Sequence, residues 1–275
     1  MDGRKELKFL LGEKELFLIE SKIRSILQKD AHQTGDSYLI RSVYFDSPDR
    51  TCFRENAAGV DRRRKYRIRT YDCDDSLIRA EIKTKYRDTT HKDSVALTRE
   101  QYEAMVFKAG SMQPHSLDSL TGTFARERVA ISPADEVQEL ATERVAISPA
   151  DSARDFDWEC CCISPAQKAQ QEFTYRILAE GYRPSCIVEY ERSAYCYEPC
   201  NVRVTFDRNI RAAGDFDRFF EKDLPTVPAC EAGKHILEVK YDEFLPEFLL
   251  QILQTGSLRR TSFSKFYRAE LALRP

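Results

Sequence analysis

Four short stretches of the chain place charged residues at alternate positions, with mostly apolar residues between them. They are residues 65–69 (KYRIR), 79–85 (RAEIKTK), 202–207 (VRVTFD) and 237–241 (LEVKY). Because successive side chains of a β-strand point to opposite faces, each stretch would have one charged and one apolar face. A strand whose charged face points to solvent would explain any one of these stretches. Four such stretches, which combine Arg and Lys with single Glu residues, need a further explanation. The pattern predicts a sheet or barrel whose charged faces converge on a polyanion, with the acids holding a metal ion.

The residue types on these faces suit phosphate. Arg offers a planar fork to two phosphate oxygens, and Lys offers a compact positive charge. Glu6 and Glu238 have two interpretations. They pair with the neighbouring cations, or they hold Mg²⁺ or Mn²⁺, which prefer oxygen ligands and bridge to substrate phosphates. The sequence has no Walker loop, GxGxxG, kinase or HExxH motif, and its four histidines show no ligand spacing. A phosphate site built from strand side chains is the interpretation that remains.

Composition limits the classes of protein. The 275 residues allow one large domain or two small ones, and 42% hydrophobic residues can build a core. The net charge of -2 and the pI of about 6.2 favour a local anion site over a broad nucleic-acid surface. The N-terminus has no signal-peptide pattern, and no apolar stretch is long enough to span a membrane. The nine cysteines lack zinc or disulfide spacing, so we expect reduced thiols in a cytoplasmic protein.

Periodicity predicts the main elements. We expect a helix from Thr98 to Lys108 that starts with a capping box between Thr98 and Gln101. The polar residues 72–75 predict a hairpin between the strands around Arg67 and Glu81. If residues 259–268 are helical, Ser262 and Lys265 lie on one face. The remaining expected strands are 5–10, 38–45, 186–190, 202–207 and 235–241, and the remaining expected helices are 16–29, 165–180 and 245–253.

One region carries a tandem repeat. The motif Glu-x-x-x-Ile-Ser-Pro-Ala starts at Glu127, Glu143 and Glu159. Each copy has the form of a helix start, with Ser as N-cap and Pro as the first helical residue. Three such polar units are too few for a solenoid. We expect residues 124–167 to be a surface insertion within a single domain that comprises residues 1–275, with partner binding as the alternative role.

The order of the motifs resembles a known family. The motifs are RKELK (4–8), SVYFD (42–46), YRIR (66–69), EIKTK (81–85), YERSAY (190–195), VRVTFD (202–207), LEVK (237–240) and SFSKFYR (262–268). Together they resemble the VTC domain, the polyphosphate polymerase branch of the triphosphate tunnel metalloenzymes. Each motif alone is weak, but eight in order are specific, and they cover both ends of the chain outside the repeat region.

The resemblance implies an α+β fold, in which a closed antiparallel eight-stranded β-barrel encloses a charged tunnel and helices pack outside. It also implies transfer of the terminal phosphate of ATP onto inorganic polyphosphate with Mn²⁺ or Mg²⁺. By position it puts Glu238 on the metal, and we add Glu6 as a second candidate. We expect Lys8, Arg67, Arg69, Lys83 and Arg203 to act in catalysis, and Lys85, Lys92, Arg192, Lys240, Lys265 and Ser262 to bind phosphate.

Two departures keep alternatives open. Related triphosphatases begin with ExExK, whereas this chain has Arg4 at the first position, which favours the polymerase branch but removes a metal carboxylate. Ser262 stands where the family often has a second basic residue. A triphosphate or short-polyphosphate hydrolase, and a non-enzymatic sensor of polyphosphate or inositol polyphosphate, are therefore the competing functions. The expected ligands are ATP and polyphosphate rather than nucleic acid, and a membrane or protein partner stays open.

Overall fold

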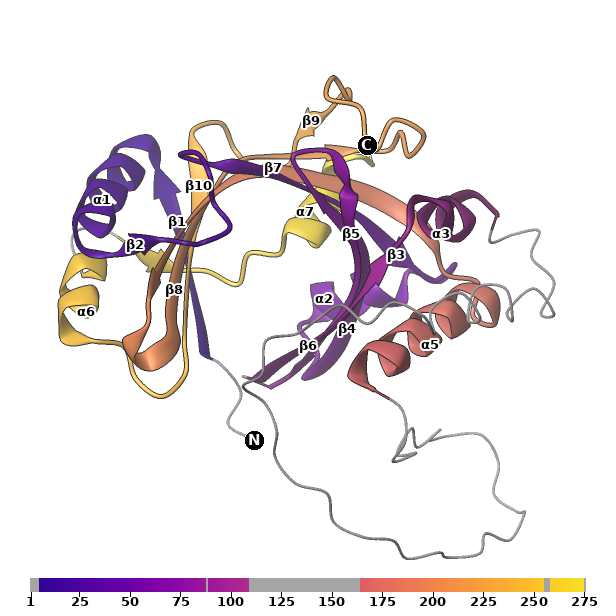
Figure 1. Ribbon diagram of the computed structural model, residues 1–275, viewed down its shortest axis with the longest axis horizontal. Helices are drawn as coiled ribbons and strands as arrows, with labels where there is room; N and C mark the ends of the chain where they lie inside the picture. Colours follow the sequence, from indigo (N-terminus) through magenta and orange to yellow (C-terminus); the bar gives the residue numbers. More distant parts are fainter. Residues whose placement is uncertain (1–4, 88, 109–163, 255–257, 275) are drawn as a thin grey trace, which may run out of the picture. The chain divides into compact units, whose positions relative to one another are not determined.

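The computed structural model describes residues 5–87, 89–108, 164–254 and 258–274. Its strands form one antiparallel sheet of eleven (Figure 1). From one edge to the other, the order is β11 (Arg259–Arg260), β1 (Lys5–Gly12), β10 (Lys234–Tyr241), β8 (Val202–Ala213), β7 (Arg183–Tyr197), β3 (Tyr38–Asp46), β4 (Arg62–Tyr71), β5 (Asp74–Tyr86) and β6 (Thr89–Leu97). Two short strands are added beside this path, because β2 (Gln28–Lys29) pairs with β7 and β9 (Val227–Pro228) pairs with β8.

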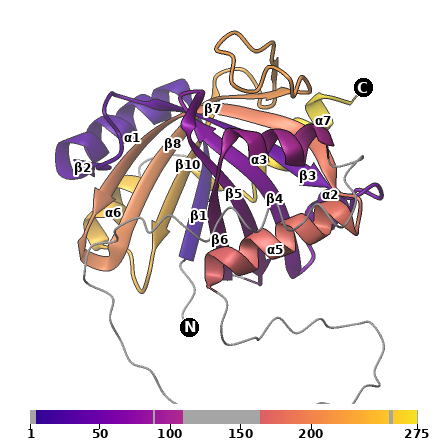
Figure 2. The same cartoon turned by 45° about the vertical axis from the view of Figure 1, so that its right-hand side comes forward.

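The expected closed eight-stranded barrel is wrong, because the sheet is open. Within the described part of the chain, no pairing joins β6 to β1. The outer edge of β1 is used instead by β11 and by the Thr261 amide, which donates to the Lys8 carbonyl at 3.0 Å. The sheet nevertheless curves strongly (Figures 1 and 2). Its two ends approach closely enough for Lys83 of β5 to lie 3.6 Å from Glu6 of β1.

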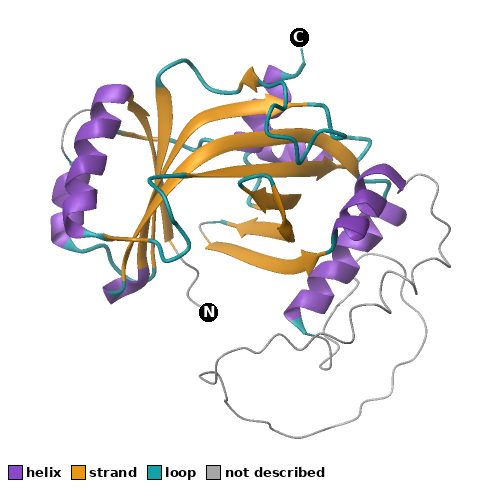
Figure 3. Cartoon of the chain, turned by 45° about the horizontal axis from the view of Figure 1, so that its top comes forward, coloured by secondary structure: helices purple, strands orange, loops and turns teal. Residues whose placement is uncertain are grey.

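The convex face of the sheet is apolar and is covered by two groups of helices (Figure 3). Helices α1 (Glu13–Ile26) and α6 (Glu247–Leu253) cover β1, β10 and β8, where Leu11, Val204 and Leu237 are buried. Over β4, β5 and β6 lie α3 (Arg99–Glu103), its π-helical continuation η1 (Ala104–Lys108) and α5 (Pro165–Leu178). Burial of these faces supplies the main driving force for folding. It also fixes which face of each strand remains for the charged residues.

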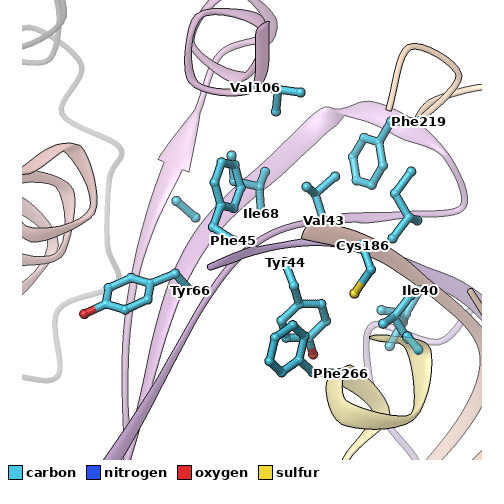
Figure 4. Close-up of a cluster of buried hydrophobic side chains, with 14 of the residues drawn as sticks. Ile40, Val43, Tyr44, Phe45, Tyr66, Ile68, Val106, Cys186, Phe219 and Phe266 are labelled. Carbon is cyan, nitrogen blue, oxygen red and sulfur yellow. The ribbon is translucent and has the colours of Figure 1, made fainter. Parts of the chain in front are cut away.

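Helix α7 (Lys265–Ala272) lies inside the curve of the sheet (Figure 1). Phe266 stacks on Tyr44 of β3 at 5.1 Å between ring centroids, on the opposite side of the sheet from Phe45 and Ile68 (Figure 4). Helix α2 (Thr51–Ala58) supports α7, because Phe53 stacks on Tyr267. Aromatic side chains of α7 thus cover part of the inner face, and the charged residues occupy the rest.

Several local predictions are confirmed. Thr98 and Gln101 form the expected capping box, as do Ser164 and Gln167 of the third repeat copy. Asp72 and Cys73 both have positive φ at the β4–β5 hairpin, the geometry of a two-residue type I′ turn.

Other local features differ from the expectations or extend them. Ser262 precedes α7 instead of lying on it, and α2, β6 and the 3₁₀ turn η4 (Pro199–Asn201) were not predicted. The first two repeat copies lie outside the described residues. No described helix is long and apolar enough to cross a membrane.

Candidate functional site

The strand register gathers the predicted cations on one face of the sheet. Directly opposed residues of an antiparallel pair share a face. Lys8 opposes Glu238, Glu6 opposes Lys240, and Lys240 opposes Arg203. In the other half of the sheet, Arg67 opposes Glu81 and Lys83 opposes both Lys65 and Lys92. We call this inner surface the charged face, and it also carries Arg69, Lys85 and Arg192.

At the centre of the charged face, buried and partly buried ionic groups form a deep cluster, made up of Lys8, Arg192, Asp207, Glu238 and Lys265. Arg192 grips Asp207 with two hydrogen bonds of 2.6 and 2.7 Å. Lys265, at the start of α7, lies 2.5 Å from Asp207 and 3.1 Å from Glu238, and Lys8 lies 3.1 Å from Glu238. Burial alone would raise the pKa of Glu238, but Lys265 and Lys8 hold it well below its usual value. Both carboxylates are therefore ionised and offset most of the charge of the three cations.

A second group surrounds Glu81, which is almost fully buried. Its carboxylate accepts from Arg67 Nε at 2.6 Å and from Lys92 Nζ at 3.3 Å, and Arg69 lies 3.8 Å away. Although burial opposes ionisation, these cations hold the pKa of Glu81 far below its usual value. Arg67 also donates to the Tyr44 hydroxyl at 3.1 Å. The two arginines are thus held in fixed positions before any ligand arrives.

A pocket of about 200 Å³ opens where the two ends of the sheet approach each other. We call it the edge pocket. It is bounded by β1, by β4 to β6 and by residues 261–264. Its lining contains the cations Lys8, Arg63, Lys65, Lys83 and Lys85 but a single carboxylate, Glu6. Burial and the nearby Lys8 lower the pKa of Lys83 to about 7. The edge pocket contains five basic side chains for one acidic side chain, a larger excess than in the deep cluster.

Three further predicted site residues lie at or near the edges of these groups. Arg203 lies at the rim of the charged face, where it pairs with Asp30 at 3.0 Å, and its Nε is buried without a hydrogen-bond partner. Lys240 lies 3.5 Å from Glu6 and 3.7 Å from Glu238. Ser262 lines the edge pocket from the segment that precedes α7. All the predicted site residues therefore belong to this face or to the segment beside it.

Comparison with known proteins identifies the family to which the chain belongs. The chain matches the VTC domain over residues 3–273. It belongs to this family. The VTC domain is a domain of the triphosphate tunnel metalloenzyme and CYTH-like superfamily, a group of phosphate-handling enzymes. No curated protein matches this VTC domain.

Among solved structures, this VTC domain is similar to a protein of Bacillus halodurans that is provisionally described as an adenylate cyclase. The identity is 12%, the alignment covers 96% of this chain and 94% of the other, and the TM-score is 0.44. A protein of Vibrio parahaemolyticus with the same provisional description is 9% identical, with 91% and 81% coverage and a TM-score of 0.37. A protein of Pyrococcus horikoshii is 10% identical, with 91% and 88% coverage and a TM-score of 0.37.

The superfamily is generally dependent on a divalent metal, and two carboxylates of this VTC domain fit that requirement. Lys8 lies between them, 3.7 Å from Glu6 and 3.1 Å from Glu238. Glu6 Oε1 is buried without a hydrogen-bond partner, and the pKa of Glu6 is lowered to about 2 against the effect of burial, chiefly by Lys8. The described residues contain no cluster of three metal-binding side chains. The donor set therefore suits a cation that takes its other ligands from substrate phosphate and water.

The sequence predicted no role for four residues of this VTC domain. Asp207 anchors Arg192 and Lys265, and Tyr190 accepts from Arg69 at 3.3 Å beneath the Lys265 ammonium. Tyr44 holds Arg67, and Lys65 lines the edge pocket. Lys65 lies two residues from Arg67, and Asp207 lies four residues from Arg203, so each shares a strand face with a predicted site residue and alternation alone could have found both. Tyr44 and Tyr190 gave no such signal, because aromatic residues are equally common in a core.

Proposed function

We propose that this VTC domain is a polyphosphate polymerase that transfers the terminal phosphate of ATP onto a growing chain of inorganic polyphosphate. The observation that carries the proposal is the excess of basic side chains in the edge pocket, where five basic residues face one carboxylate. A single phosphate would contact few of these side chains, whereas a linked row of phosphates can contact them all and favours their protonated forms. The adjoining deep cluster continues the row of cations along the charged face. The ligand class is therefore a linear polyanion that lies along the face.

Positioning and charge neutralisation are the contributions that phosphoryl transfer needs most from a protein. Lys8 and Lys83 would neutralise phosphate oxygens in the edge pocket. Arg67 and Arg69 would hold the neighbouring phosphates, because Glu81, Tyr44 and Ser42 already fix their guanidinium groups. Glu6 and Glu238 would hold Mg²⁺ or Mn²⁺, which supplies positive charge to the transferred phosphate when bound. The acceptor is already anionic, so the proposal needs no general base.

One incubation separates the proposed function from its competitors. Purified protein is mixed with ATP and Mn²⁺, and the products are resolved by gel electrophoresis and phosphate assay. A ladder of polyphosphate supports the polymerase. Release of free phosphate without a ladder would instead identify a hydrolase. Tight binding of triphosphate with no product of either kind would identify a sensor.

The Glu238→Gln variant tests the metal assignment. It keeps the shape of the side chain but removes the charge that a divalent cation requires, so metal-dependent turnover should fall by at least about a hundredfold. Binding of triphosphate without metal should persist, because the cations remain. Glu103→Gln, on α3 at the convex face, is the matched control and should keep full turnover. Full activity of Glu238→Gln would remove Glu238 from the metal site.

The Lys83→Met variant tests the phosphate assignment. Loss of one charge-assisted contact in a confined site should weaken metal-free triphosphate binding roughly tenfold. Isothermal titration calorimetry measures this change directly. Lys22→Met, on the exposed side of α1, is the control and should bind like the parent. If Lys83→Met binds as tightly as the parent, the ligand does not reach the edge pocket.

A further inference from the structure

Lys65 differs from the other lysines that meet at the centre of the charged face. Lys8, Lys83, Lys240 and Lys265 each lie within 4 Å of a carboxylate. Among the described residues, Lys65 has no carboxylate at that distance. Its Nζ instead contacts the hydroxyl of Ser264 at 2.9 Å, across the edge pocket from β4 to the segment before α7.

The groups around Lys65 are predominantly cationic. Lys8 faces it from β1, Lys83 from β5, and Arg63 and Arg67 flank it along β4. The carboxylate of the edge pocket, Glu6, is already shared among Lys8, Lys83 and Lys240. Burial, followed by repulsion from these cations, therefore lowers the pKa of Lys65 well below its usual value. A protonated Lys65 has no balancing charge until an anion enters.

The hydroxyl of Ser264 completes the arrangement. Its oxygen accepts from the amide of Tyr267 at 3.3 Å, which caps α7, and it also contacts Lys65 Nζ. When Lys65 is protonated, Ser264 can only accept from it, so the hydroxyl proton of Ser264 must point elsewhere. A phosphate oxygen in the edge pocket is a suitable acceptor. Lys65 and Ser264 can thus both donate to the same phosphate.

We propose that Lys65 and Ser264 form a phosphate subsite of the edge pocket, and that binding of a phosphate chain there is coupled to uptake of a proton by Lys65. The inference rests on the proposed function and deepens it, because it assigns a contact and a pH dependence to the same ligand class. The uncharged amine takes one proton from solvent and becomes an ammonium paired with phosphate oxygen. No bond other than the new N–H is formed.

The direction of the pH dependence follows from the charges. A bound phosphate favours the ammonium form and moves the pKa of Lys65 back toward its usual value. Between the free and bound values, each binding event takes up a proton. Affinity should therefore fall as the pH rises through this interval. Below the interval, Lys65 is protonated in both states and this coupling disappears.

The test compares two substitutions of Lys65 in the full chain. Tripolyphosphate is titrated into the protein with EDTA, at one mildly alkaline pH, in two buffers of different ionisation enthalpy. The buffer dependence of the heat gives the number of protons taken up. Lys65→Met cannot take up this proton, so its uptake should fall below that of the parent, with the remainder due to Lys83, and its affinity should fall roughly tenfold. Lys65→Arg is always protonated, so it should keep the affinity but show the same reduced uptake.

Lys85→Met is the matched control, because Lys85 lines the same pocket. It should retain the proton uptake of the parent even if it binds less tightly. Equal proton uptake by the parent and by both Lys65 variants would overturn the subsite while leaving the polymerase proposal standing. Failure of the parent to bind tripolyphosphate would overturn both. If Lys65 had only a structural role, Lys65→Arg and the parent would take up the same number of protons.

Discussion

The residues of the deep cluster depend on one another for their charge states. Asp207 is fully buried and neutralises Arg192 and Lys265, while Glu238 neutralises Lys265 and Lys8. Pairs of this kind are costly to bury, and their stabilising effect depends on every partner being present. The cluster is therefore better understood as an arrangement that places cations along the charged face than as a source of net stability.

Removal of one partner should expose that dependence. Asp207→Asn leaves Arg192 and Lys265 without their shared counter-charge, so the free energy of unfolding should fall by about 3–5 kcal/mol. Urea denaturation measures the change. Asp223→Asn, at a position where the side chain is 83% exposed, is the control and should change stability little. A stability loss of the same small size in both variants would contradict the view that Asp207 is the essential counter-charge.

The same carboxylates predict how stability depends on pH. The pKa values of Glu6, Glu81, Asp207 and Glu238 are all lowered in the folded protein. In this range the unfolded chain binds more protons than the folded one, so stability is present above the unfolded pKa of about 4 and is lost as the pH falls below it. We expect the melting temperature to drop steadily from about pH 5 downward. A melting temperature that stayed constant to pH 3 would show that these groups are not ionised pairs in solution.

At the scale of elements, the helices on the convex face fix which side of each strand becomes the charged face. Helix α5 shows this most clearly, because Phe173 meets Phe45 and Tyr66 edge-to-face at 5.2 and 5.7 Å. Tyr66 and Arg67 are neighbours in sequence, so burial of one ring directs the next side chain to the opposite face. Packing on the outside therefore positions a site residue on the inside.

Truncation at this contact should be costly. Phe173→Ala removes a fully buried ring and should destabilise the protein by about 3–5 kcal/mol. Tyr175→Ala, two residues along α5 at a side chain that is 50% exposed, is the matched control and should cost much less. Thermal or urea unfolding of the two variants measures the difference. Similar losses for both would mean that α5 does not pack on the sheet through Phe173.

The elements also show what the sequence could predict. Strict alternation predicted β4, β5, β8 and β10, and the side-chain pattern Thr-x-x-Gln predicted the start of α3. These features are local. By contrast, β6 alternates poorly, with the sequence TTHKDSVAL, and α2 begins after Arg50 at positive φ with no side-chain cap. Local rules therefore gave no signal for either element.

At the scale of the whole molecule, the open sheet could not be inferred from the chain. Closure depends on whether β1 and β6 meet, and these strands are far apart in sequence. In this structure, β11 and Thr261 occupy the edge of β1, and side chains such as Glu6 and Lys83 contact each other where the ends of the sheet approach. Alternation predicted the charged face correctly but contained no information about this edge. The edge pocket, which carries the proposed function, lies where the two ends of this open sheet approach each other.

We propose that the repeat region is an insertion in a single domain. The described residues between 5 and 108 and between 164 and 274 belong to one compact unit, and the proposed insertion 124–167 ends within the first residues of α5. Deletion of residues 124–155 leaves residues 109–123 and 156–163 as the connection, and residues 109–123 alone can reach about 50 Å. The described cores and the charged face contain none of the deleted residues.

The melting temperature and the affinity for metal-free triphosphate should therefore both stay close to those of the parent. Deletion of residues 165–178, which form α5, serves as the contrasting variant and should prevent folding. A large loss of thermal stability after removal of 124–155 would show that the repeats belong to the fold. Unchanged stability with lost polymerase activity would place them in function instead.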